Sequence, residues 1–208
     1  MELFADRAEA GELLAERLRD ARDPVLLALP RGGVAVAAPI ARRLGTPLEV
    51  LVTRKIGYPP APELGVGALA EGGEPVFDLR LLHRLGMTPE SVAGVVERER
   101  RELARRVRTY RGDRPLPSLE GREVIVVDDG LATGGTARAA LRAVRAAKPA
   151  KVTLAVPVGA HETVMSLREE ADEVVVLREP VDFRAVGQWY EHFGQLSDDD
   201  VLELLGRG

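Results

Sequence analysis

The sequence predicts an α/β fold in which a parallel sheet is flanked by helices. Short, continuous apolar runs recur along the chain, and such runs are typical of strands that are buried on both faces. Helical patterns separate these runs, and the alternation favours parallel strands joined by right-handed crossovers. Charged or glycine-rich turns follow several of the runs, at the edge where parallel sheets bind ligands.

Length and composition are those of one globular domain spanning residues 1–208. The chain is 45% hydrophobic and 30% charged, and its net charge of −4 disfavours a general nucleic-acid or membrane binder. The first ten residues are too polar for a secretory signal, and no apolar run reaches the roughly 18 residues of a membrane helix. We therefore expect a cytoplasmic protein. With no cysteine and three scattered histidines, we expect no metal held by protein ligands alone.

The first strand is expected at 25–29, after an amphipathic helix over 6–20 that Asp6 would cap. A second helix is expected over 34–44, with a kink or a late start because of Pro39. Arg31, Gly32 and Gly33 stand between that strand and that helix. Such a turn can accept an anion, although turns of this kind are common in α/β proteins.

The next strand, 48–53, is expected to end at the basic pair Arg54 and Lys55. Residues 54–73 are dense in glycine and proline and too long for a plain connection, so we expect a flexible loop there, with 66–70 able to pair as a strand within it. The alternative is a solvated basic pair at a strand end.

A short helix is expected at 79–85 and a long, arginine-rich one over 88–110. RNA binding by the arginines is one interpretation. Spacings such as Glu97–Arg101 and Glu102–Arg106 instead favour ordinary stabilising pairs on a surface that is solvated or contacts a second copy. We expect a homodimer and no nucleic-acid partner.

The most informative stretch runs from Val124 to Thr136. Four apolar residues predict a buried strand; Asp128 and Asp129 follow it, then a loop rich in glycine and threonine, then a helix to about Ala147. Backbone N–H groups, hydroxyls and a helix N-terminus suit a phosphate. Ionised carboxylates accept hydrogen bonds from hydroxyls. The stretch therefore predicts a site for a sugar that carries both a phosphate and free hydroxyls.

This stretch resembles the 5-phosphoribosyl-1-pyrophosphate (PRPP) signature of type I phosphoribosyltransferases. The resemblance implies a Rossmann-like parallel sheet with a small hood and a flexible loop. It also implies that Asp128 and Asp129 hold the ribose hydroxyls. The loop that would bind the 5′-phosphate consists of Ala132, Thr133, Gly134, Gly135 and Thr136. An ordinary Asp-Gly turn explains only one or two of these positions.

By the same resemblance, Arg31 with Gly32 and Gly33 forms the pyrophosphate loop, and Arg54 or Lys55 arrives when the flexible loop closes. The implied activity is phosphoribosyl transfer from PRPP, with Mg²⁺ carried by the substrate, to a nucleobase or related acceptor. Enzymes for hypoxanthine and guanine carry an acid/base aspartate where this chain has Ala132, which disfavours a 6-oxopurine. The acceptor stays open.

Two more strands and a helix are expected, at 151–157, 173–177 and 161–170. The tail, 178–208, is expected to form the hood, in which Trp189, Tyr190 or Phe183 stacks on the acceptor or packs the tail onto the core. His192 is expected to be structural. The alternatives are a non-catalytic PRPP-sensing regulator that binds RNA and, less favoured, a sugar-phosphate hydrolase. A P-loop kinase is excluded because its motif is absent.

Overall fold

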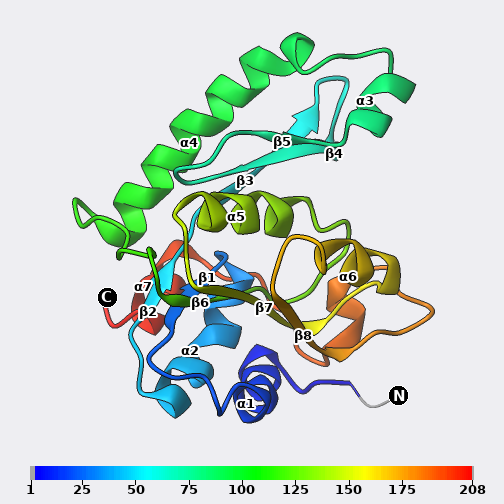
Figure 1. The fold of residues 1–208 in the computed structure, drawn as a ribbon. Helices are drawn as coiled ribbons and strands as arrows, with labels where there is room; N and C mark the ends of the chain where they lie inside the picture. Colours follow the sequence, from blue (N-terminus) through cyan, green and yellow to red (C-terminus); the bar gives the residue numbers. More distant parts are fainter. Residues whose placement is uncertain (1–2, 208) are drawn as a thin grey trace.

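The centre of this computed structural model, which describes residues 3–207, is a sheet of five parallel strands in the order β2-β1-β6-β7-β8 (Figure 1). The strands are β1 (Val25–Ala28), β2 (Leu48–Val50), β6 (Glu123–Val127), β7 (Lys151–Val158) and β8 (Glu173–Arg178). Ala28 at the end of β1 lies beside Val50 of β2 and Val127 of β6. The strand order reverses between β1 and β6, so the carboxyl ends of these two strands flank the point where such sheets bind ligands.

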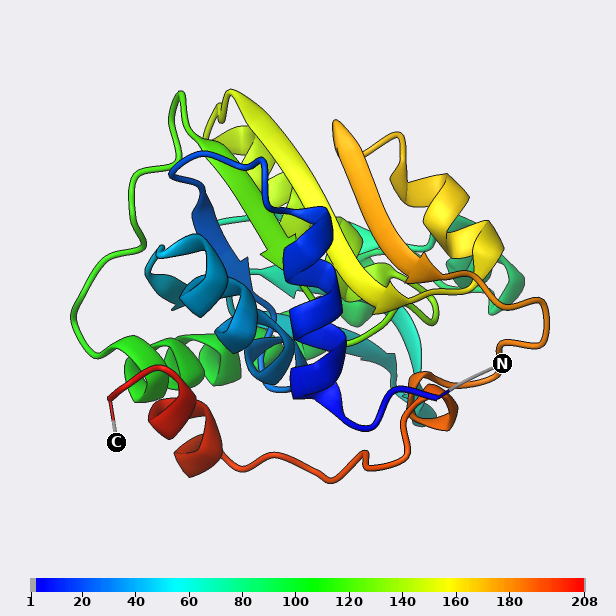
Figure 2. The same cartoon turned by 90° about the horizontal axis from the view of Figure 1, so that it is seen from below.

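Helices cover both faces of this sheet. Side chains of α1 (Arg7–Arg17) and α2 (Gly32–Leu44) pack on one face, and those of α5 (Gly135–Ala146) and α6 (His161–Leu167) pack on the other (Figures 1 and 2). The predicted α/β fold with a flanked parallel sheet is therefore confirmed. The strands form because their apolar side chains are buried on both faces: every residue from Val124 to Val127 is fully buried.

The first two helices fit the sequence prediction closely. Asp6 caps α1, and its carboxylate accepts hydrogen bonds from the backbone N–H groups of Ala8 and Glu9. Helix α1 lies against α2 at Gly11, where a Cβ would come within 2.2 Å of the Val36 carbonyl oxygen. Helix α2 begins at Gly32 and passes through Pro39, so the late start that Pro39 suggested is wrong.

A small antiparallel sheet stands apart from the main one, and α5 lies between the two (Figure 1). Its strands are β3 (Thr53–Tyr58), β4 (Ala61–Ala70) and β5 (Val76–Phe77). The elements that follow are α3 (Leu79–Arg84), the 3-10 turn η1 (Glu90–Val92) and α4 (Ala93–Arg111). On α4, Arg106 pairs with Glu102 as predicted, and Arg100 pairs with Glu97, which supports the solvated-surface interpretation of its arginines.

This second sheet corrects the sequence prediction for the segment after β2. The strand expected over 48–53 ends at Val50, and much of the expected loop 54–73 is the β3–β4 hairpin. The glycines there allow close approach of the strands: a Cβ on Gly57 would lie 2.4 Å from the Pro62 carbonyl oxygen, and one on Gly67 would lie 2.6 Å from that of Val76. Movement of the hairpin stays a prediction.

The tail packs along α1 and α2 rather than forming a sheet. It contains the 3-10 turn η2 (Val186–Trp189) and the short helix α7 (Asp198–Leu204). Phe4 pairs with Tyr190 across a single β-bridge, which joins the tail to the start of the chain. Figure 2 shows the tail running past the N-terminal end of α1 on its way to α7. Its role as a hood over the acceptor stays a prediction.

Candidate functional site

The side chains of the signature meet the β1–α2 turn at the carboxyl edge of the main sheet. Asp128 and Asp129 directly follow β6, and Arg31, Gly32 and Gly33 lie where the chain passes from β1 into α2. These strands are hydrogen-bonded neighbours, so the two turns lie side by side. A Cβ on Gly32 would lie 1.9 Å from Oδ2 of Asp129, which shows how closely the turns approach. The peptide bond between Pro30 and Arg31 is cis.

The two aspartates are held differently. Asp128 turns back on its own backbone, and its Oδ1 accepts the Asp129 N–H at 2.8 Å. Asp129 accepts a hydrogen bond from Nε of Arg7 at 2.9 Å and leaves 16% of its side chain exposed. The Tyr190 hydroxyl donates to the Asp129 carbonyl oxygen at 2.6 Å. Asp129 is therefore held in place by Arg7 of helix α1 and by Tyr190 of the tail.

Burial governs the protonation of this pair. Burial raises the pKa of Asp128 well above its usual range, and the neighbouring charge of Asp129 raises it further. Burial also raises the pKa of Asp129, although the Arg7 guanidinium lowers it in part. The site therefore resists holding two negative charges, and ligand groups that donate hydrogen bonds or bring positive charge favour the ionised pair.

The loop between β6 and α5 presents its backbone outward. Ala132 and Thr133 are exposed, and Gly134 has a left-handed φ of 73°, where a side chain would be strained. A Cβ on Gly135 would meet nothing within 4 Å, so this position faces open space at the start of the twelve-residue helix α5. The Thr163 hydroxyl donates to the Ala132 carbonyl oxygen at 2.6 Å and ties the loop to α6.

A cavity of about 1080 Å³ separates this loop from the β3–β4 hairpin. Thr133, Gly135 and Thr136 line one side, and Lys55 and Asp78 lie on the hairpin side. The structure thus brings the predicted phosphate loop and Lys55 to one cavity, whose volume is ample for a phosphorylated sugar.

Arg54 does not join Lys55 there. The two residues are neighbours in β3, and neighbouring side chains of a strand point to opposite faces. Arg54 pairs through Nε with Glu99 of α4 at 2.7 Å, whereas Lys55 donates across the hairpin to the Glu63 carbonyl oxygen at 2.8 Å. Of this basic pair, Lys55 is the member positioned to reach a ligand in the cavity.

Two further predicted site residues, Arg31 and Trp189, differ in their exposure to solvent. The side chain of Arg31 is 40% exposed, and its Nη1 lies 4.0 Å from a carboxylate oxygen of Asp198. Trp189 is 5% exposed and belongs to a buried cluster with Phe4 and Tyr190. Its position favours packing of the tail onto the core, the second of the two roles that the sequence allowed.

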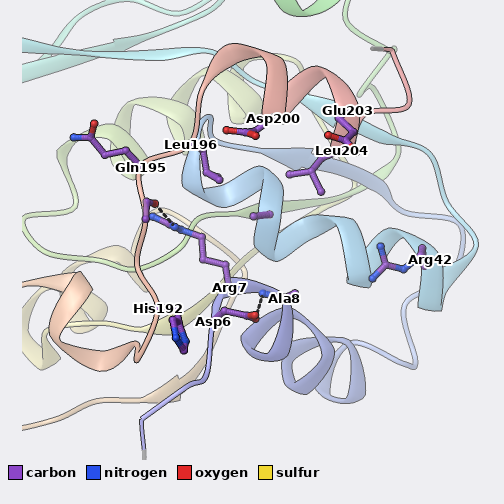
Figure 3. A pocket seen from close by; sticks show the side chains of 12 residues that line it. Asp6, Arg7, Ala8, Arg42, His192, Gln195, Leu196, Asp200, Glu203 and Leu204 are labelled. Carbon is purple, nitrogen blue, oxygen red and sulfur yellow. Dashed lines mark hydrogen bonds between the residues drawn. The ribbon is translucent and has the colours of Figure 1, made fainter.

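Arg7 is the site residue that sequence reasoning missed. It lies 122 positions from Asp129, so no local pattern links the two. A second cavity, of about 640 Å³, lies beyond Arg7 between α1, α2 and the tail. Figure 3 shows Arg7 extending from the start of α1 toward the tail, where a dashed line marks its hydrogen bond to the Gly194 carbonyl oxygen.

Comparisons with known proteins identify a family. The family model described as the phosphoribosyl transferase domain matches residues 2–189. The chain belongs to this family. Two Mycobacterium tuberculosis proteins, from different strains and provisionally named as phosphoribosyl transferases, are 44% identical over 209 residues, which cover 100% of this chain and 47% of theirs. The chain therefore spans about half the length of these curated relatives.

Solved structures show the same fold. A Thermus thermophilus protein is 45% identical, covers 99% of this chain with 98% of its own, and superposes with a TM-score of 0.81. A Neisseria gonorrhoeae protein determined with bound ppGpp is 15% identical, and the match covers 99% of this chain and 96% of that one at a TM-score of 0.52. At that identity the likeness concerns the fold alone.

Residues 3–207 contain no cluster of three or more His, Cys, Asp or Glu side chains that could hold a metal ion. None of their helices combines the length and apolar character that crossing a bilayer requires.

Proposed function

We propose that this chain transfers the 5-phosphoribosyl group of PRPP to a nucleobase or related acceptor and releases pyrophosphate. The convergence of three features at the carboxyl edge of the sheet carries the proposal. Asp128 and Asp129 follow β6, and the turn at Gly32 approaches Asp129 closely. Residues of the phosphate loop line the neighbouring cavity, whose lining does not include the two aspartates, and we expect one ligand to contact all three features. PRPP carries a 5′-phosphate, two hydroxyls and a pyrophosphate in the matching order.

The loop before α5 suits the 5′-phosphate. Its exposed backbone at Ala132 and Thr133 and the open space at Gly135 admit an anion to the N-terminus of a twelve-residue helix. The carboxylates of Asp128 and Asp129 would accept hydrogen bonds from the ribose hydroxyls, which satisfies buried acceptors that the protein leaves partly free.

In the proposed reaction, the bond from C1′ to the pyrophosphate oxygen breaks, and an acceptor atom forms the new bond to C1′. Positive charge grows on the ribose while negative charge grows on the leaving group. The backbone N–H of Gly32, together with Arg31, would stabilise the leaving pyrophosphate, and Lys55 would reach it if the hairpin closes. The predicted contribution of Gly33 is not available in this conformation, because its N–H donates to the Leu29 carbonyl oxygen at 3.1 Å.

A Mg²⁺ ion carried by PRPP would neutralise part of the charge on the pyrophosphate. The donor set fits such an ion: Asp128 and Asp129 are hard oxygen ligands, and two carboxylates suit a magnesium whose other ligands come from the substrate. Arg7 already offsets one of these charges.

A 6-oxopurine acceptor is disfavoured, because Ala132 occupies the position of the acid/base aspartate that enzymes for hypoxanthine and guanine carry. The acceptor would approach C1′ beside the loop that contains Ala132.

We also expect a cytoplasmic homodimer; light scattering at several protein concentrations tests the assembly.

Pyrophosphate release tests the reaction. Wild-type protein is incubated with PRPP and Mg²⁺ against a panel of bases and amines, with Asp128→Asn as the inactive control. We expect acceptor-dependent release by the wild type alone. Absence of PRPP binding would remove the proposal. Tight binding without turnover on any acceptor would favour the non-catalytic regulator.

The regulatory alternative has its own probes. Structures of this fold include the Neisseria gonorrhoeae protein with bound ppGpp, so competition between ppGpp and PRPP is a direct measurement. RNA affinity that falls with added salt would support the alternative, and no RNA binding at low salt would count against it.

A further inference from the structure

Arg7 lies between the two halves of the proposed PRPP site. Its Nε donates to Oδ2 of Asp129 at 2.9 Å, on the ribose side. The same nitrogen lies 3.1 Å from the point that a Cβ on Gly32 would occupy, on the pyrophosphate side. Only 11% of the side chain is exposed. Arg7 is thus a largely covered cation that lies against both turns.

The remaining contacts fix the guanidinium from the tail. Nη1 donates to the Gly194 carbonyl oxygen at 2.9 Å (Figure 3). The guanidinium carbon lies 3.8 Å from the centroid of the Phe193 ring. A cation over an aromatic face is attracted to it, and the ring prevents the guanidinium from moving that way. The orientation of Arg7 is therefore set before any ligand arrives.

These contacts leave hydrogen-bonding capacity unused. A guanidinium carries five N–H donors, and the bonds to Asp129 and Gly194 use two of them. Within residues 3–207, no further hydrogen bond of Arg7 is described. Its planar fork can bind a carboxylate and a phosphate oxygen at the same time.

The other cations near the pyrophosphate turn are less suited to a fixed role. Arg31 is 40% exposed and faces Asp198, while Arg54 is paired with Glu99 on α4. Lys55 lies across the cavity on the hairpin. Arg7 alone among these four combines burial with contact to both Asp129 and Gly32.

We propose that Arg7 is a substrate-binding residue for the pyrophosphate group of PRPP, which it binds while it keeps its hydrogen bond to Asp129. The inference rests on the proposed function and deepens it. Arg7 would then orient Asp129, which is proposed to hold the ribose, and would also stabilise negative charge on the leaving pyrophosphate. It would thereby link sugar binding to pyrophosphate release.

Calorimetry with three probes tests the assignment: Mg²⁺–pyrophosphate, ribose 5-phosphate and Mg²⁺–PRPP. In Arg7→Gln, we expect the affinities for pyrophosphate and PRPP to fall about 10- to 100-fold, the range for a charged hydrogen bond, while ribose 5-phosphate changes less than about threefold. In Asp128→Asn, we expect the reverse selectivity: ribose 5-phosphate weakens more than pyrophosphate.

Arg43→Gln is the matched control. Arg43 also joins α2 to α1, through an exposed pair with Glu16 at 2.6 Å, but it touches neither turn. All three affinities should match the wild type. If Arg7→Gln does not fold, Arg7→Lys, which keeps the charge, replaces it with the same readout, and selective weakening of pyrophosphate is again the expected result.

Unchanged pyrophosphate affinity, or equal weakening of all three probes, would overturn the inference and make Arg7 a tether for the tail. That result differs from failure of the proposed function. If wild-type protein binds neither PRPP nor ribose 5-phosphate, the proposed function itself fails, whatever the Arg7 variants do.

Discussion

The β1–α2 turn and the β6–α5 loop look alike in sequence, since each has two adjacent glycines where a helix begins after a strand, yet the space around Gly33 and Gly135 differs. At the β1–α2 turn the protein fills the space: a Cβ on Gly32 would strike the Asp129 carboxylate, and one on Gly33 would lie 2.6 Å from the Val127 carbonyl oxygen. At the β6–α5 loop, a Cβ on Gly134 would lie 2.7 Å from the Thr163 methyl carbon, whereas one on Gly135 would meet nothing within 4 Å.

This difference in surrounding space distinguishes two reasons why a position would require glycine. Gly33 is required by packing, because backbone lies where its side chain would stand. Gly135 has no such neighbour, and its backbone faces a cavity of about 1080 Å³ that the loop shares with the hairpin. Packing therefore explains Gly33, whereas a ligand best explains Gly135.

The largest expected effect is that of Gly135→Val. Its side chain would enter the cavity where the 5′-phosphate is proposed to bind, so PRPP affinity should fall by about 100-fold or more, the loss expected when charged hydrogen bonds are prevented. The melting temperature should stay close to that of the wild type, because nothing lies within 4 Å of the new Cβ. Calorimetry and a thermal scan measure both.

Gly135→Ala is the graded control and should have a smaller effect on affinity. Normal PRPP binding by Gly135→Val would show that the phosphate binds elsewhere. The contrast between the two turns would then lose its functional meaning.

Asp128→Asn follows, at the point where the two turns meet. An amide has only one acceptor oxygen, whereas a carboxylate has two. Turnover with PRPP and affinity for PRPP should therefore fall about 100-fold, as measured by kinetics and calorimetry. Asp129→Asn should behave similarly. Unchanged kinetics in both variants would contradict the assigned ribose contacts.

The same variant should change the response to pH. Since burial raises the pKa of Asp128 above the ordinary 3.8, its stabilising contribution is complete below that value and is lost as the pH rises through the raised pKa. Asp128→Asn should therefore be more stable than the wild type at pH 8 and lose this advantage near pH 4, which urea unfolding at the two pH values measures.

Much of this arrangement is predictable from sequence, because apolar runs mark strands that are buried on both faces. The apolar run from Val124 to Val127 predicts strand β6. The acids, the turn and helix α5 that follow are also predictable from residues next to one another in the sequence. The hairpin was harder to predict: Gly57, Pro62 and Gly67 are residues that strands disfavour, and only the close approach of their partners explains them.

Contacts between distant segments lay beyond the sequence. Arg7 and Asp129 meet because α1 packs on α2, and no spacing rule encodes that contact. The separation of Arg54 from Lys55 follows once β3 is known to be a strand, since alternate side chains then face opposite ways. Burial of Trp189 likewise depends on Phe4, at the other end of the chain.

Gly33→Ala tests how closely the β1–α2 turn is packed. Its Cβ would overlap the backbone at Val127, which cannot move without disturbing β6, so we expect a loss of about 2–3 kcal/mol in the free energy of unfolding. Gly94→Ala in α4 is the matched control; nothing lies within 4 Å of its Cβ, and alanine favours a helix. Equal stability of Gly33→Ala and the wild type would show that the turn is not closely packed.

The smallest expected effect concerns what holds the open loop in place. Thr163→Val removes the hydroxyl that donates to the Ala132 carbonyl oxygen, and this single neutral hydrogen bond contributes about 0.5–1.5 kcal/mol. Because the loop is proposed to bind the phosphate in this conformation, PRPP affinity should fall two- to tenfold, roughly the same energy. Thr109→Val, which removes a similar bond to Arg105 inside α4, should leave affinity unchanged. An equal change in both variants would mean that the anchor at Thr163 does not preorganise the loop, and that its glycines alone set the shape the ligand meets.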